Sequence, residues 1–82
     1  MDRVIFRKFK NGDIIALLPD NPVSNSMYID SYMHTGQHGE ASIDITRWTK
    51  LATPDEYADL LTELKAIGYD PIVYKRINRG IR

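Results

Sequence analysis

The amino-acid sequence predicts an α+β domain, in which a largely antiparallel sheet of four or five strands packs one face against a single amphipathic helix. Three observations carry this prediction. An Asn-Gly pair separates two β-prone runs near the N-terminus, and two further alternating runs flank a loop that contains glycines. A capped apolar stripe with the helical period follows, and a short β-prone run comes after it. The predicted order of elements is therefore β-β-β-β-α-β.

Residues 4–10 and 13–18 form the first predicted hairpin, around Asn11-Gly12. A two-residue type I′ turn needs positive φ at both central positions, and Asn-Gly meets this need. That turn places Arg7 opposite Ala16. The alternation of side chains then makes both faces of the hairpin apolar. One of these faces carries Ile5, Phe9, Ile14 and Leu18.

Two apolar faces need cover, but the chain has one strong helix, and this helix covers one face. A second copy of the chain is the simplest cover for the other face, and symmetric dimers are the commonest oligomers. We therefore predict a homodimer, with Ile5, Phe9, Ile14 and Leu18 as candidate interface residues.

A second hairpin is predicted from residues 26–33 and 41–48, which alternate apolar and polar side chains. Residues 35–40 lie between them and contain two glycines, so we expect a loop with one or both glycines at positive φ. The two prolines in residues 19–25 predict a connecting loop before this hairpin.

The helix begins at a capping box. Thr53 is the predicted N-cap, Pro54 suits the first helical position, and Glu56 completes the box three residues later. Gly68 is the expected glycine just past the helix end, and residues 72–75 form the last strand. The apolar stripe consists of Tyr57, Leu60, Leu61, Leu64 and Ile67.

The length of 82 residues predicts one domain, which we place at residues 1–76, followed by a frayed basic tail at 77–82. The absence of cysteine excludes disulfides and thiolate metal sites. No apolar run approaches the roughly 20 residues that cross a bilayer, and the N-terminus lacks a signal-peptide core. We therefore predict a cytoplasmic protein without a membrane partner.

The net charge is zero, but both ends are basic and the body is acidic. Residues 1–10 have four cations and one acid, for a net charge of +3, and residues 75–82 have four cations and no acid, for +4. Residues 11–74 have three cations and ten acids, for −7. Such asymmetry is found in nucleic-acid contacts and also in solvated chain ends.

Four stretches together resemble a family of small uncharacterised proteins from gut bacteria that are often associated with mobile genetic elements. The resemblance extends over nearly the whole chain. It implies a small α+β domain in a bacterial cytoplasm, and it implies no activity, ligand or site residue. The stretches are residues 4–10, 31–39, 52–60 and 67–69.

Two groups of polar residues are candidates for chemistry. His34, His38 and Glu40 are a weak candidate for a metal site, because their loop setting removes the geometry of a helical His pair. Either histidine beside a carboxylate is a candidate for proton transfer, but no nucleophile has a recognisable setting. A domain this small also has little room for a pocket of roughly 300 Å³ or more. We therefore predict neither a catalytic residue nor a cofactor.

Basic residues at the two ends are candidates for a nucleic-acid contact, if the first and last strands lie side by side. Tyr28, Tyr32 or Trp48 would then offer surfaces on which bases stack. The candidate cations are Arg7, Lys8, Lys75, Arg76 and Arg79.

The chain thus contains no motif that is specific to one function. The favoured hypothesis is a non-enzymatic interaction or assembly module that works as a homodimer with an unidentified protein partner. The alternative is a small nucleic-acid-binding or regulatory protein that uses its basic ends. A histidine-dependent or metal-dependent enzyme comes third.

Overall fold

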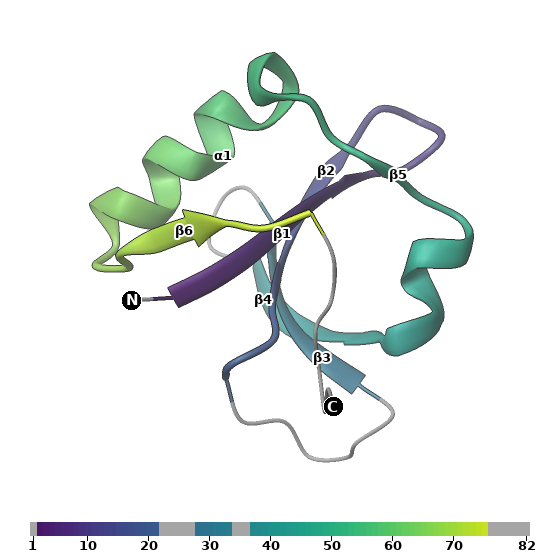
Figure 1. Ribbon diagram of the computed structural model, residues 1–82, viewed down its shortest axis with the longest axis horizontal. Coiled ribbons are helices and arrows are strands. Elements are labelled where there is room, and N and C mark those ends of the chain that lie inside the picture. Colours follow the sequence, from purple (N-terminus) through teal and green to yellow (C-terminus); the bar gives the residue numbers. More distant parts are fainter. Residues whose placement is uncertain (1, 22–27, 34–36, 76–82) are drawn as a thin grey trace.

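The computed structural model of the protein describes residues 2–21, 28–33 and 37–75, and it confirms the α+β class. One six-stranded sheet carries a single α-helix on one face (Figure 1). The elements are β1 (Asp2–Lys8), β2 (Ile14–Leu18), β3 (Tyr28–Met33), β4 (Gln37–Ser42), the 3₁₀ helix η1 (Ile43–Arg47), β5 (Lys50–Leu51), α1 (Pro54–Ala66) and β6 (Pro71–Val73).

Strand β1 pairs with three other strands of the sheet. The strand order is β4-β3-β2-β1-β5, and all of these neighbours are antiparallel. The last strand, β6, runs parallel to the N-terminal half of β1, on the same side as β5. The first and last strands therefore lie side by side (Figure 1).

The register of the first hairpin differs from the predicted one. Arg7 lies opposite Ile15, not Ala16. The Gly12 N–H donates to the Phe9 carbonyl, and the Phe9 N–H donates to the Asp13 carbonyl, each over 2.9 Å. The loop thus has three residues, with Gly12 at φ +96° in the position of a glycine bulge. This extra loop residue shifts the pairing by one.

The shift changes which residues share a face, since successive strand residues point to opposite sides. Ile5 and Phe9 lie on the face away from α1, whereas Ile14 and Leu18 lie on the face toward it. Ile5 and Leu18 are each 1% exposed in the single chain. The four candidate interface residues therefore do not form one exposed surface, and the homodimer loses this support.

The chain itself buries both faces of its first hairpin. Ile45 of η1 covers the face that α1 leaves open, so this face does not need a second copy of the chain to cover it. The cluster under α1 consists of Val4, Phe6, Ala16, Leu18, Tyr32, Ala52, Leu60 and Leu64. The cluster on the other face consists of Ile5, Ile15, Leu17, Ile29 and Ile45.

The helix follows its sequence signals at both ends. The Thr53 hydroxyl accepts from the Glu56 N–H, and the Glu56 carboxylate accepts from the Thr53 N–H, which completes the capping box. Gly68, at φ +113°, ends the helix as predicted. Ile67, however, is 49% exposed, so the buried stripe stops one turn earlier, at Leu64. No helix in the described residues is long and apolar enough to cross a membrane.

The second strand of the second hairpin starts earlier than predicted. Gln37–Ser42 is a strand rather than a loop, and Gly39 lies in it opposite Ser31 without a positive φ. The stretch expected to be the strand folds into η1, because the Ser42 hydroxyl caps the Asp44 N–H and Ile45 turns into the core. The predicted tail at 77–82 lies outside the described residues.

Candidate functional site

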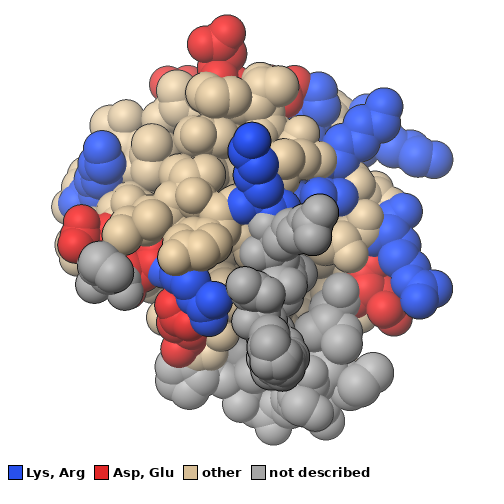
Figure 2. All heavy atoms as spheres, in the orientation of Figure 1, with Lys and Arg blue, Asp and Glu red and all other residues tan. Residues whose placement is uncertain are grey.

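A hollow of about 410 Å³ lies where the end of the first hairpin meets η1 and β5. In Figure 2, Lys and Arg side chains gather along the right-hand margin, over these elements. We call this hollow the basic groove. Its described lining consists of Lys8, Phe9, Lys10, Arg47, Trp48, Thr49 and Lys50, and none of these residues is acidic.

Arg7 holds the wall of the basic groove in place. Its Nη2 donates to the carbonyls of Thr46 at 3.0 Å and Thr49 at 2.5 Å, and its Nε donates to Thr49 Oγ1 at 3.0 Å. Thr49 in turn donates its hydroxyl proton to the Ile45 carbonyl at 2.8 Å. Partial burial lowers the pKa of Arg7 below its ordinary value. Arg7 therefore positions the segment that carries Trp48, and Nε and Nη2 of its guanidinium are already bonded within the chain.

Trp48 is the exposed aromatic residue of the basic groove. It follows η1 as its C-cap, and 51% of its surface is accessible. Tyr28, the second stacking candidate from the sequence, is 41% exposed on β3, away from this lining. Tyr32, the third, is 1% exposed and cannot stack on a base.

The cations of the basic groove differ in how they are paired. Lys10 and Lys50 form no ion pair with any residue in the described parts of the chain. Arg47 lies 3.7 Å from the Asp44 carboxylate, and both side chains are largely exposed, so water screens this pair. Lys8 forms an ion pair with Glu56 at the start of α1. Positive charge therefore exceeds negative charge around the groove.

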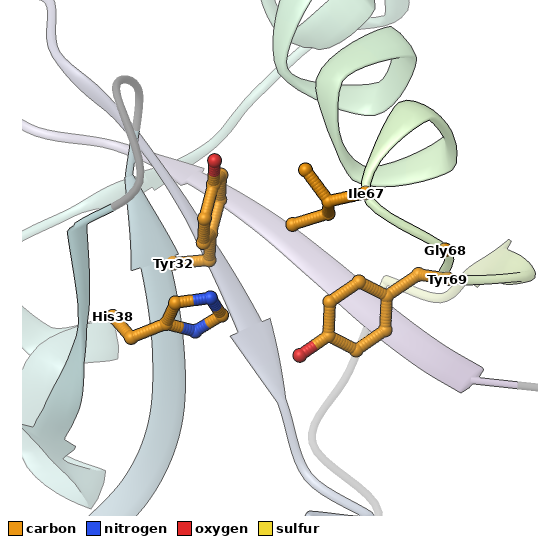
Figure 3. A pocket seen from close by; sticks show the side chains of 5 residues that line it. All are labelled: Tyr32, His38, Ile67, Gly68 and Tyr69. Atoms are coloured by element: carbon orange, nitrogen blue, oxygen red, sulfur yellow. The ribbon is translucent and has the colours of Figure 1, made fainter.

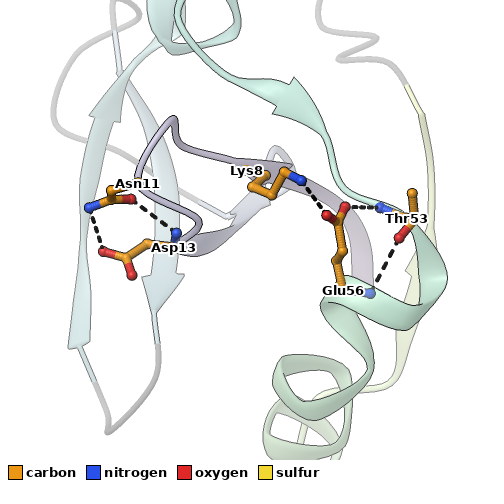
Figure 4. Close-up of polar contacts among 5 residues, drawn as sticks. All are labelled: Lys8, Asn11, Asp13, Thr53 and Glu56. Atoms are coloured by element: carbon orange, nitrogen blue, oxygen red, sulfur yellow. Dashed lines mark hydrogen bonds and ion pairs between the residues drawn. The ribbon is translucent and has the colours of Figure 1, made fainter.

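The Lys8–Glu56 pair joins β1 to the helix cap, as Figure 4 shows. Donation from Lys8, assisted by the Thr53 N–H, lowers the pKa of Glu56 below its ordinary value. A carboxylate with a lowered folded-state pKa stabilises the fold above its unfolded-state pKa. This stabilisation is lost as the pH falls through the folded-state pKa.

We therefore expect Glu56→Gln to lower the melting temperature at neutral pH, and the difference from wild type to shrink below about pH 4. Circular dichroism melts over a pH series provide the measurement. Asp55→Asn is the matched control, because Asp55 lies in the same helical turn and forms no ion pair among the described residues. A difference for Glu56→Gln that stays constant with pH would contradict this account.

The cations proposed from the sequence do not all lie at one site. Arg7 and Lys8 lie at the basic groove, but both are engaged. Lys75 lines a different hollow of about 260 Å³, between β5 and β6. Arg76 and Arg79 lie outside the described residues. Arg47 and Lys50 were not among the predicted cations, although two basic residues, one on either side of Trp48, are a readable signal of a basic aromatic surface.

The structure describes two of the three residues of the metal-site candidate. His38 and Glu40 lie two residues apart on β4, and His34 falls outside the described residues. Among the residues that the structure places, no group of three His, Cys, Asp or Glu side chains is arranged to hold a metal ion.

His38 instead lines a hollow of about 380 Å³ near the end of α1, with Tyr32, Ile67, Gly68 and Tyr69 (Figure 3). Its imidazole meets the Tyr32 ring edge-on, with the ring centres 4.7 Å apart. The Tyr32 hydroxyl donates to the Glu63 carboxylate. The described lining of this hollow contains no serine, threonine, cysteine or lysine to act as a nucleophile.

Neither a protein-family model, nor a curated protein, nor a solved structure matches this chain. The resemblance to small proteins of gut bacteria therefore stays a prediction. Function must be argued from the site alone.

Proposed function

We propose that this protein binds single-stranded nucleic acid in the basic groove. One observation carries the proposal: Trp48 is 51% exposed inside a hollow whose charged lining residues are all cations. An exposed aromatic ring offers a face for a base, and the surrounding cations attract the phosphates on either side of it.

A single strand fits this surface better than a duplex. A base can stack on Trp48 only if it is free of its neighbours, as it is in a single strand. Reading a duplex through its major groove requires a helix or a β-ribbon with basic side chains. The α-helix of the described residues carries four acids against Lys65, so its charge opposes such a contact; the acids are Asp55, Glu56, Asp59 and Glu63.

Trp48 is the only tryptophan of the chain, which makes it a direct probe of the site. We expect oligonucleotides of about 16 nucleotides to quench its fluorescence, as a stacked base does. Binding should weaken steeply between about 50 and 200 mM salt, because neutralised phosphates release counterions. A fluorescence titration at several salt concentrations, with single-stranded and duplex forms of one sequence, measures both effects.

The double variant Lys10→Gln, Lys50→Gln removes the two unpaired cations. We expect it to bind more weakly at every salt concentration and to reduce the salt slope by about 1.4, at roughly 0.7 for each phosphate that is no longer neutralised. Lys65→Gln on α1 is the matched control and should bind as wild type does. The absence of binding at low salt would overturn the proposal, and so would an equal loss in the Lys65 variant.

A further inference from the structure

The two edges of the sheet are protected differently. The outer side of β1 is shared by two short strands: β5 with two residues, including Lys50, and β6 with three residues, beginning at Pro71. Short strands, lysine and proline are the features by which proteins keep an edge from pairing. The opposite edge is β4, which has six residues with neither lysine nor proline.

Strand β4 is also regular. It pairs with β3 at six consecutive positions, from Tyr28 opposite Ser42 to Met33 opposite Gln37, without a bulge. Among the described residues, no strand pairs with its other side. His38, Gly39 and Glu40, at its centre, are all exposed. Among the residues that the structure describes, the β4 edge therefore presents an open row of backbone donors and acceptors.

We propose that two copies of this chain pair antiparallel through their β4 edges, with the twofold axis at Gly39. The sequence of β4 is complementary to itself in this register. His38 of each copy lies opposite the partner's Glu40, and the two Gly39 residues face each other at the axis. Opposite residues in an antiparallel pair have Cβ atoms about 4.5–5.5 Å apart, so an imidazole N–H can donate to the facing carboxylate.

Other registers are poorer. An axis at Glu40 sets the two glutamates opposite each other, and like charges in opposite positions are destabilising. An axis at His38 sets two imidazoles together and leaves both glutamates without an imidazole donor.

The pairing makes one continuous sheet from two copies, and this interface differs from the one that the sequence suggested. It uses backbone hydrogen bonds and one polar pair, repeated by symmetry, instead of the apolar residues of the first hairpin. It does not depend on nucleic-acid binding, because no residue of the β4 edge lines the basic groove.

Sedimentation equilibrium and light scattering test the pairing. We expect the mass of two chains, each of 9.4 kDa, at micromolar concentration. His38→Glu and Glu40→His should each raise the dimer dissociation constant about two- to thirty-fold, because each removes both symmetric pairs. The double variant His38→Glu, Glu40→His restores a complementary pair and should recover most of the affinity.

Each outcome decides the proposal. Recovery in the double variant supports it, as does hydrogen-exchange protection of the β4 amides that disappears on dilution. A mass of one chain from micromolar to millimolar concentration overturns it. If neither single variant weakens the dimer, its interface lies at another surface, and this result also overturns the proposal. If a single variant does not fold, the wild-type exchange experiment still decides.

Discussion

Phe6→Ala is expected to lower the free energy of unfolding by about 3–5 kcal/mol. Phe6 is 1% exposed at the centre of the cluster beneath α1. Its ring stacks on that of Tyr57 with the ring centres 4.3 Å apart, so the substitution removes packing between helix and sheet and leaves a cavity. Whole domains are stable by only about 5–15 kcal/mol, so the variant should be close to unfolding.

Urea denaturation followed by far-ultraviolet circular dichroism measures this loss. Ile67→Ala is the control, because it also removes a large apolar side chain from the helical stripe, but from a residue that is 49% exposed. We expect the control to change the stability by about 0.5 kcal/mol or less. Equal losses in the two variants would show that burial beneath α1 does not determine stability here.

Arg7→Gln is expected to reduce both stability and nucleic-acid affinity. The substitution removes the bonds from the guanidinium to the Thr46 carbonyl and to both oxygens of Thr49. Hydrogen bonds to charged groups contribute about 1.5–3 kcal/mol each, and we expect a total loss in this range, because glutamine can replace part of the network. The link that carries Trp48 then loses its fixed position.

Arg3→Gln is the matched control for Arg7→Gln. Arg3 lies on the same strand, but it pairs with Asp20 at an exposed site far from the basic groove. Its loss should affect stability less and leave oligonucleotide binding unchanged. Urea titration and Trp48 fluorescence distinguish the two roles. An Arg7 variant that binds as wild type does would show that the groove does not depend on this guanidinium.

Local sequence predicted the helix and turn positions well where a particular residue type is needed for a particular backbone conformation or cap. The capping box at Thr53 and the glycine at position 68 fixed both ends of α1. The Asn11-Gly12 turn was predicted as a hairpin, but its register was not, because two loop types both place glycine at positive φ. The bond from the Asp13 N–H to the Asn11 side chain depends on the folded loop.

The second hairpin is present as predicted, but the residues of its second strand were predicted wrongly, for a related reason. Alternating isoleucines in residues 43–47 fit a strand, and a 3₁₀ helix that buries one of them fits the same pattern. A tertiary contact decides between strand and 3₁₀ helix here, because Ile45 packs on the face of β1 and β2 that α1 leaves open. The basic groove could not be predicted from local sequence for the same reason. Its two halves are about 40 residues apart in sequence, and Arg7 joins them through a tertiary contact.

The parallel pairing of β6 with β1 has a consequence for the order of folding. The Asp70 N–H donates to the Asp2 carboxylate across 68 positions of sequence, and β6 completes the sheet beside residues at the very start of the chain. Closing so long a loop costs more conformational entropy than closing the first hairpin does. On the ribosome, the meander of β1 to β4 can therefore form early. The N-terminal half of the outer side of β1 has to wait, uncovered, until the residues of β6 have been synthesised.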